Sequence, residues 1–458
     1  MMRPMSETRS APSPATPLKC ADYMPLGPAG EQAARAGLSQ VALGLVGSEI
    51  LKIAASVRAL QLKGHKVCNL TVGDFLPSQF PIPELLQAAI TRAYERRETN
   101  YPPSDGMPAL REAVCEYYRQ TLGLDYPIES VVICGGARPA IYGTYRAVIE
   151  RGDRVIYPTP SWNNNHYIHL CEGVPVECPT RPEDGFMPTA QTLVPLFPGA
   201  RLLCLNSPLN PTGTVLAADE LGRICDAILA ENRRRAQTGE RPLYLMYDQV
   251  YYSLTFGAVR HHTPPELRPE MTAYTIFVDA ISKSLCSTGL RVGWAMAPPY
   301  ITARMRDVLG HVGAWAPRAE QLAAAEMLAD TAAMAAFHHV MKVQVKLRLD
   351  LLYEGFTQLQ GLGLPVRAVP PQGAIYLSVQ FALHGQKLPS GQTITTNEQI
   401  RGYLLDAAGM AVVPFQAFGM KEESGWFRLS VGAVSPAEVT ELLPRLRQAL
   451  TALVPAAS

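Results

Sequence analysis

Seven short apolar runs constrain the fold more than any other feature of this sequence. They lie at 130–134, 154–157, 174–178, 202–205, 243–247, 275–278 and 292–296. Each has the length of a buried strand, and most are separated by segments long enough for a crossover connection. The alternation predicts an α/β fold built on a mostly parallel, seven-stranded sheet. Ligands of such sheets bind at the carboxyl ends of the strands, so the residues after each run are the first candidates for a site.

The flanking segments predict the helices and the division of the chain into domains. Apolar residues recur at helical spacing over 48–62, 81–94 and 108–122, and an Ala- and Met-rich helical stretch runs from 318 to about 353. After about residue 310 the strand signal fades, and the remainder predicts a smaller α+β unit. We therefore expect four parts: a flexible N-terminal tail over 1–45, the first part of a small domain over 46–78, a large domain over 79–325, and the rest of the small domain over 326–458.

The bulk composition is that of a globular enzyme. The 458 residues are 47% apolar and 18% charged, with a formal net charge of +1. Because the charge is nearly balanced we expect no nucleic-acid partner, and because no apolar run reaches about 18 residues we expect no membrane span. The nine cysteines are scattered without a C-x-x-C pair, which favours a reducing compartment, and we predict a cytoplasmic protein. His166 and His169 lack the carboxylate or cysteine cluster of a metal site, and we predict no metal.

The stretch from Ile281 to Trp294 carries a lysine and an arginine directly after an apolar run. Lys283 follows the run at 275–278, and Arg291 comes eight residues later. A lysine at the end of a buried strand loses hydration, which disfavours its charged form and makes its amine more nucleophilic. The guanidinium fork of an arginine suits a phosphate. A solvated Lys-Arg turn is the alternative, and the residues after the other strands decide between the two.

Four other strand ends carry groups that a phosphate-bearing ring would use. Glycines ahead of a helix at 135–138 leave backbone N–H groups for a phosphate. Trp162 offers either a packing surface under its loop or a stacking surface for a flat ring. Asn210 is exposed by a rigid turn, and Asp248 ends an apolar strand. A carboxylate in that position costs free energy unless a cation, such as a protonated ring nitrogen, meets it.

These residues form motifs that resemble those of a known family. N-P-T-G at 210–213, D-x-x-Y at 248–251 and S-K-x5-G-x-R-x-G at 282–293 occur together in this order and spacing. The set is similar to that of the aspartate aminotransferase family, the class I/II aminotransferases of fold type I, which use pyridoxal 5′-phosphate (PLP). The likeness runs from about residue 48 to the C-terminus. It implies a large domain with the predicted sheet and a smaller α+β domain.

The resemblance implies a PLP site formed by the matching residues. Lys283 bonds covalently to PLP and moves the proton between the substrate's Cα and the cofactor. Asp248 keeps the pyridine nitrogen protonated, so that the ring withdraws electrons. Tyr251 and Asn210 hydrogen-bond the ring's 3′ oxygen. The remaining implied contacts are stacking by Trp162, phosphate binding by Arg291 and by the backbone at Gly136, Ala137 and Arg138, and a contact from Tyr101 to the phosphate of the neighbouring subunit's cofactor.

The resemblance also implies the reaction, the substrates and the partner. The enzyme would move an amino group between an L-amino acid and a 2-oxo acid, as a two-fold homodimer with shared active sites. Arg428 would bind the α-carboxylate, with Gly73 and Asn210 beside it. Arg138 and Ser48 match residues that meet the distal group of a dicarboxylate in some bacterial members, which favours aspartate, glutamate and their 2-oxo acids. The alternative is that Arg138 points into solvent.

Three positions depart from the family pattern, and two other functions remain open. Ala280 replaces a frequent serine, Gln249 replaces an acidic residue, and the Gly-rich turn is shortened to Gly73-Asp74-Phe75. Tyr376 matches a structural strand, and we expect it in the core. An enzyme of the same fold that catalyses β- or γ-elimination, replacement or cyclisation would use the same lysine, aspartate and arginine. A transcription regulator with an aminotransferase-like domain would need a basic DNA-binding module, which the first 45 residues lack.

Overall fold

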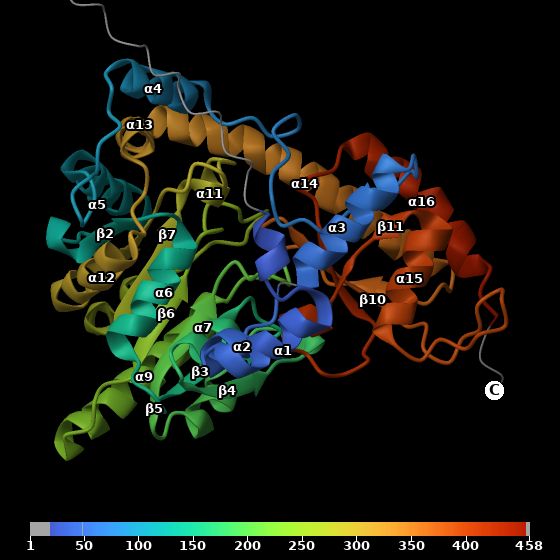
Figure 1. The fold of residues 1–458 in the computed structure, drawn as a ribbon, viewed down its shortest axis with the longest axis horizontal. Helices are drawn as coiled ribbons and strands as arrows, with labels where there is room; N and C mark the ends of the chain where they lie inside the picture. Colours follow the sequence, from blue (N-terminus) through green and yellow to red (C-terminus); the bar gives the residue numbers. More distant parts are fainter. Residues whose placement is uncertain (1–18, 48, 455–458) are drawn as a thin grey trace, which may run out of the picture. The chain divides into compact units, whose positions relative to one another are not determined.

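The computed structural model describes residues 19–47 and 49–454 (Figure 1). They form two compact units, the first ending at Val46 and the second beginning at Gly47. Within the segment 1–45, where we expected a flexible tail, the first unit contains η1 (Cys20–Tyr23), α1 (Gly27–Gly37) and α2 (Gln40–Leu43). Pro28 stands in the first turn of α1, and the Ser39 hydroxyl accepts the Ala42 N–H at 3.2 Å and caps α2.

The second unit is organised around a seven-stranded sheet with the order β2-β8-β7-β6-β5-β3-β4. Its strands are β2 (Val131–Cys134), β3 (Arg154–Thr159), β4 (Val174–Pro179), β5 (Ala200–Asn206), β6 (Tyr244–Asp248), β7 (Thr275–Ala280) and β8 (Gly293–Met296). Only β8 runs antiparallel to its two neighbours, β2 and β7. The prediction of a mostly parallel seven-stranded sheet is confirmed, because each apolar run became one strand.

Alternate residues of these strands enter two separate cores. On β2, Val131 and Ile133 belong to one core, and Val132 and Cys134 belong to the other. The first core is closed by α4 (Glu84–Glu95), α5 (Pro108–Leu122), α9 (Ala218–Thr238) and α13 (Arg318–Ala329). The second is closed by α6 (Ala137–Val148), α7 (Asn164–Leu170) and α12 (Pro299–Val312). The large sheet therefore lies between two layers of helices (Figure 1).

The C-terminal part of the chain forms a second, antiparallel sheet with the order β12-β13-β10-β9. Its strands are β9 (Val366–Ala368), β10 (Tyr376–Phe381), β12 (Val413–Pro414) and β13 (Trp426–Ser430). A short parallel pair, β1 (Cys68–Asn69) with β11 (Met410–Ala411), joins this part to the segment that precedes the large sheet. The helices here are α3 (Glu49–Leu62), α14 (Thr331–Gly361), α15 (Asn397–Ala408) and α16 (Pro436–Thr451).

The Ala- and Met-rich stretch is two helices rather than one. It breaks at Asp330, between α13 and α14. The Asp330 carboxylate accepts the N–H of Ala333 at 2.9 Å and so begins a new helix. The remaining short elements are α8 (Ala190–Leu193), α10 (Pro264–Leu267), α11 (Ile281–Ser284), η2 (Ile128–Ser130), η3 (Pro182–Asp184), η4 (Val194–Leu196), η5 (Pro269–Ala273) and η6 (Phe415–Phe418). No helix in the described ranges is long and apolar enough to cross a bilayer.

The turn after β5 joins the two sheets through a glycine. The carbonyl of Gly213 accepts the N–H groups of Gln372 and Gly373, each at 2.9 Å. Gly213 has a φ of +73°, and a Cβ at this position would overlap the backbone carbonyl of Tyr376. The N-P-T-G turn thus needs glycine for both its conformation and its close approach to β10.

We predict that Gly213→Ala destabilises the protein more than Gly239→Ala. Both residues have a left-handed φ, +73° and +74°, but a Cβ at Gly239 meets open space. The Gly239 change should cost about 1 kcal/mol of unfolding free energy, and the overlap at Gly213 should add about 1–3 kcal/mol. Chemical denaturation of both variants measures this difference. Equal losses would contradict the close packing of the turn against β10.

Candidate active site

The predicted site residues meet where β5, β6 and β7 of the large sheet end. Asn206 at the end of β5 pairs with Asp248 at the end of β6, and Asp248 pairs with Val278 on β7. The chain leaves β7 through the short helix α11, which carries Lys283. Parallel strands thus bring to one edge residues that lie far apart in the sequence.

Lys283 has an amine whose charged form is less favourable than that of an ordinary, solvated lysine. Its Nζ donates a hydrogen bond to the carbonyl of Gly73 at 2.6 Å and lies 5.8 Å from the centre of the Tyr251 ring. Burial lowers the pKa of Lys283 to about 8, with the Asp74 charge opposing the shift and the Arg428 charge adding to it. A larger fraction of this amine is therefore neutral near pH 7 than of an ordinary lysine, and a neutral amine is a nucleophile and a base.

Asp248 presents a carboxylate without a cationic partner. Its Oδ1 accepts the N–H of Val250 at 3.2 Å. Burial raises the pKa of Asp248 to about 7, and this hydrogen bond opposes the shift. No Lys, Arg or His of the described chain forms an ion pair with it. A carboxylate in this state is suited to a positively charged nitrogen of a ligand.

Glycines and an arginine form a cradle where β2 ends. Arg291 donates from Nη2 to the Gly135 carbonyl at 2.9 Å and from Nη1 to the Thr288 carbonyl at 2.6 Å. Gly136 has a φ of +99°, and a Cβ there would overlap the Arg291 guanidinium. A Cβ on Gly293 would lie 2.6 Å from the backbone of Gly136, so β8 and the start of α6 are in close contact. A guanidinium beside a helix N-terminus is an anion site of the kind that holds a phosphate.

Arg428 on β13 supplies a second place for an anion. The side chain is 1% exposed, and its Nη2 donates to the Thr71 carbonyl at 2.5 Å and its Nη1 to the Asn210 Oδ1 at 3.2 Å. The Nε has no hydrogen-bond partner within the described chain. The guanidinium also stacks on the rings of Tyr376 and Phe418, at 4.8 and 4.9 Å. A buried guanidinium without a carboxylate fits a carboxylate of a ligand.

Tyr376 belongs to this cluster, although we expected it only in the core. It is buried as expected, but its hydroxyl lies 2.5 Å from the hydroxyl of Tyr251. On the paired strands Ser378 stands opposite Arg428, so Tyr376 is its diagonal neighbour on the same face. The register of β10 and β13 would have revealed this tyrosine, but the sequence alone does not give that register.

The shortened turn at 73–75 contributes two contacts to the site that the sequence did not predict. A Cβ on Gly73 would lie 2.6 Å from the Tyr376 hydroxyl oxygen, which explains a glycine here. Asp74 accepts a hydrogen bond from the Thr288 hydroxyl at 2.6 Å and so ties this turn to the loop between Lys283 and Arg291. The family pattern has an acidic residue in the corresponding turn, and this match could have identified Asp74 as a site residue.

Of three further predicted residues, two are exposed and one lies outside the described chain. The guanidinium of Arg138, which is exposed, lies 4.6 Å from the centre of the Trp162 ring, so the two pack on each other. Tyr101 is 81% exposed and packs edge-to-face on Trp315 at 5.4 Å. Ser48 lies outside the described residues.

The glutamine that replaces the family's acidic residue lies in a buried polar network. Gln249 donates from Nε2 to the hydroxyl of Tyr118 at 3.0 Å, and that hydroxyl donates to Asp279 at 2.8 Å. His261 completes the network through the Gln249 Oε1 at 3.1 Å. These residues hydrogen-bond one another, so Gln249 supports the end of β6. The described side chains include no group of three or more His, Cys, Asp or Glu that could hold a metal ion.

Comparison with known proteins identifies the family. Residues 65–446 match the model of the family described as aminotransferase class I and II. The chain is 32% identical to an aspartate aminotransferase of Rhizobium meliloti (strain 1021) over 408 residues, covering 88% of this chain and 93% of the relative. It is 32% identical to a probable aspartate/prephenate aminotransferase of Thermus aquaticus over 388 residues, covering 84% and 93%.

Solved structures agree with this assignment. The crystal structure of the Rhizobium meliloti aspartate aminotransferase superposes with a TM-score of 0.81 at 29% identity, covering 91% of this chain and 99% of that one. The Thermus thermophilus aspartate aminotransferase with maleate gives a TM-score of 0.80 at 28% identity, covering 90% and 100%. This chain therefore belongs to the class I and II aminotransferases of fold type I, PLP-dependent enzymes that move an amino group between an amino acid and a 2-oxo acid.

Proposed function

We propose that this aminotransferase binds PLP at Lys283 and acts on a dicarboxylic amino acid, aspartate or glutamate, and the corresponding 2-oxo acids. The observation that carries the proposal is the Lys283 amine, whose pKa burial lowers to about 8 at the carboxyl edge of the large sheet. Such an amine reacts with an aldehyde at neutral pH far more readily than an ordinary lysine, because only the neutral form is a nucleophile.

The donor set around Lys283 fits PLP. The Asp248 carboxylate, which lacks a cation, suits the pyridine nitrogen, and the cradle of Arg291 and Gly136 suits the phosphate. When bound, PLP supplies an electron-withdrawing ring that stabilises negative charge at the substrate's Cα. The further proposed contacts are Tyr251 and Asn210 to the ring oxygen, Trp162 to the ring face, and the backbone N–H groups of Ala137 and Arg138 to the phosphate.

The residues of the chain divide the remaining work between proton transfer and positioning. The Lys283 Nζ accepts the proton from the substrate's Cα and returns it one step later, since its lowered pKa allows both states near neutral pH. Arg428 binds the α-carboxylate with the donors that its contacts to Thr71 and Asn210 leave available, and Gly73 leaves room beside it. The bound amino acid is then held with its Cα over the amine.

Two further observations support a dicarboxylate as the substrate. The Rhizobium meliloti relative is named an aspartate aminotransferase and the Thermus aquaticus relative a probable aspartate/prephenate aminotransferase, and the Thermus thermophilus protein was solved with maleate, a dicarboxylate. On this chain Arg138, which packs on Trp162, would meet the distal carboxylate, with Ser48 as a second contact. An exposed guanidinium on an aromatic ring keeps its donors available while its stem is fixed.

We also propose that the active enzyme is a homodimer with shared active sites. Tyr101, the residue assigned to the neighbouring subunit's cofactor phosphate, is 81% exposed. A large aromatic side chain at that exposure is available to another copy of the chain. In a two-fold assembly each protomer would contribute Tyr101 to its partner.

We predict that PLP becomes attached to Lys283 with a pH dependence set by the lowered pKa. Borohydride reduction after a short exposure to PLP should label Lys283, as identified by peptide mass spectrometry. The labelling rate should rise about tenfold per pH unit below pH 8 and level off above it, following the neutral amine fraction. Surface lysines serve as the internal reference and should continue to gain labelling toward pH 10.

A labelling rate that keeps rising up to pH 10 would contradict the assignment of Lys283. Attachment of PLP at another lysine would contradict it as well. Lys283→Ala is the matched control and should lose the site-specific label. With L-aspartate and 2-oxoglutarate the loaded enzyme should produce oxaloacetate and glutamate. Release of ammonia in place of glutamate would indicate elimination rather than transamination.

We predict that Arg428→Lys weakens substrate binding and leaves PLP attachment intact. A lysine keeps the charge but loses the planar fork, so the KM for the amino acid and for the 2-oxo acid should each rise about 10- to 100-fold. Arg367→Lys, on the neighbouring part of the same small sheet and exposed, is the control and should leave both KM values unchanged. Loss of PLP attachment with unchanged KM would refute this role for Arg428.

We predict that Arg138→Ala lowers kcat/KM for aspartate about tenfold or more relative to alanine, because one charge-assisted contact is lost only by the dicarboxylate. Arg138→Lys keeps a cation and should retain part of the preference. Steady-state kinetics with both amino acids measures the ratio. An equal loss for both substrates would mean that the Arg138 side chain faces solvent and only its backbone contributes.

A further inference from the structure

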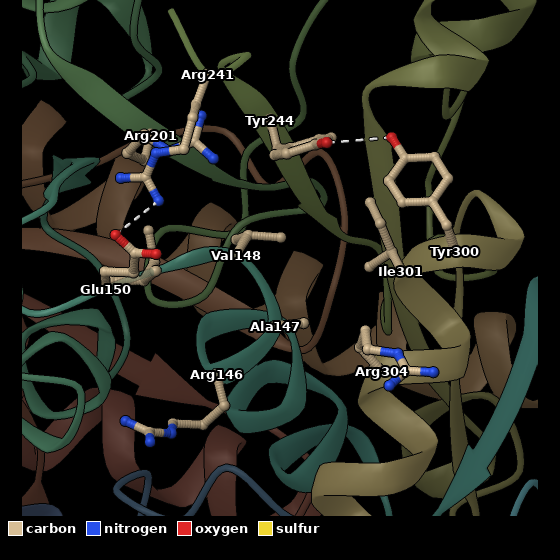
Figure 2. A pocket seen from close by; sticks show the side chains of 11 residues that line it. Arg146, Ala147, Val148, Glu150, Arg201, Arg241, Tyr244, Tyr300, Ile301 and Arg304 are labelled. Carbon is tan, nitrogen blue, oxygen red and sulfur yellow. Dashed lines mark hydrogen bonds and ion pairs between the residues drawn. The ribbon is translucent and has the colours of Figure 1, made fainter.

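A basic pocket lies at the amino ends of β5 and β6, whereas the candidate active site lies at the carboxyl ends of these strands. It has a volume of about 320 Å³. Its charged and polar lining comprises Arg146 at the end of α6, Arg201 and Tyr244 at the start of β5 and β6, Tyr300 and Arg304 in α12, and Glu150 and Arg241 from the adjoining loops. Figure 2 shows Arg201 and Arg241 on one side and Arg304 on the other. We define these lining residues as the basic pocket.

The length of the strands separates this pocket from the active site. Arg201 stands near the start of β5, and Asn206, which pairs with Asp248, stands at its end. Five residues of extended chain span roughly 17 Å. The basic pocket is therefore a separate cavity, and none of its lining residues belongs to the site around Lys283.

The carboxylates near the pocket neutralise its arginines only in part. Arg241 pairs with Glu150 at 3.1 Å and with Asp153 at 2.5 Å, and Arg304 pairs with Asp307 at 3.1 Å. Two of these three carboxylates share a single guanidinium. The described residues provide Arg146, the third arginine of the lining, with no ion pair to a carboxylate.

Arg201 is the buried member of this group and lacks a full set of partners. It is 8% exposed, its Nη1 donates to the Pro242 carbonyl, and its Nε has no hydrogen-bond partner within the described chain. The nearest carboxylate oxygen, on Asp153, is 3.9 Å from that Nε. Burial and the like charge of Arg241 lower the pKa of Arg201. An anion in the pocket would relieve both effects, because it adds negative charge beside clustered positive charges.

The other lining groups also favour an anion. The hydroxyls of Tyr244 and Tyr300 lie 3.1 Å apart, so one donates to the other and the acceptor's own O–H is left available to an anion. Tyr300 and Ile301 belong to the first turn of α12, where the helix dipole is positive. Against the four guanidinium groups stand the carboxylates of Glu150, Asp153 and Asp307, so the net formal charge is 4 − 3 = +1. The C-terminal end of α6 offsets part of this charge with roughly half a negative charge.

We propose that the basic pocket binds a small multivalent oxyanion, a metabolite that carries two or more negative charges on phosphate or carboxylate groups. The guanidinium fork recognises both groups by paired hydrogen bonds. A volume of about 320 Å³ is at the lower end of ligand sites and suits a molecule of the size of a diphosphate or a tricarboxylate. This site is additional to the substrate and cofactor sites proposed above.

Binding is tested on the PLP-loaded enzyme with two probes, inorganic pyrophosphate and citrate, by isothermal titration calorimetry at low ionic strength. The variants are Arg304→Glu and Arg306→Glu. Both residues stand on α12 and both pair with Asp307, but only Arg304 lines the pocket. We expect a saturable site that Arg304→Glu weakens about tenfold or more and Arg306→Glu weakens about twofold or less. Citrate bound at the substrate site is distinguished by its insensitivity to both changes. Arg304→Gln, which keeps polarity, should have an intermediate effect.

The probe that binds more tightly identifies whether phosphate or carboxylate is the natural group. Absence of a saturable site for both probes, or equal weakening by the two glutamate variants, would overturn the proposal. The PLP content of each variant is measured from its absorbance. If the chain does not hold PLP, the proposed function fails, but the difference between the Arg304 and Arg306 variants still decides whether the basic pocket binds the anion.

Discussion

Two buried charged groups, the Asp248 carboxylate and the Arg428 guanidinium, have no charged partner in the described chain. The two sheets hold both groups in this unpaired state. Each is held by neutral groups, the Val250 N–H in one case and carbonyl oxygens of Thr71 and Asn210 in the other. Neutral contacts satisfy geometry but leave most of the desolvation cost of a charge in place. The surrounding cores must offset that cost in the ligand-free protein. Binding of ligand groups of the opposite charge therefore stabilises the protein. In this respect a preorganised binding site differs from an interior whose charges are already paired.

The order of the strands explains how a lysine and an arginine eight residues apart could serve different ends of one ligand, as we propose. Lys283 leaves β7 at the carboxyl edge, and the chain then turns back into β8, which runs antiparallel between β7 and β2. That reversal places Gly293 against Gly136 and puts Arg291 at the start of α6. A parallel strand at this position would begin at the far edge of the sheet and would need a crossover before it. The single antiparallel strand thus closes the anion cradle.

Much of the architecture follows from local sequence signals, because a buried strand needs an apolar run and each of the seven runs became a strand of the large sheet. The chemistry at the strand ends was also visible, since Lys283, Asp248 and Asn210 stand directly after those runs. What sequence reasoning missed depends on register and distant packing. Tyr376 comes beside Arg428 through the pairing of β10 with β13, and the basic pocket joins the ends of elements that no motif connects. The Ala329–Thr331 break was missed because one capping carboxylate outweighs a continuous helical pattern.

Helix α6 has its two ends in different chemical surroundings. Its first residue, Ala137, follows the glycine cradle against Arg291, and its last turn, with Arg146, lines the basic pocket. Twelve residues of α-helix form a rod of about 18 Å, and the helix packs along α12 and β8, so it moves as one body. An axial displacement of this rod would therefore change the glycine cradle and the basic pocket together. Selection on the residues at either end of α6 is therefore subject to a common mechanical constraint.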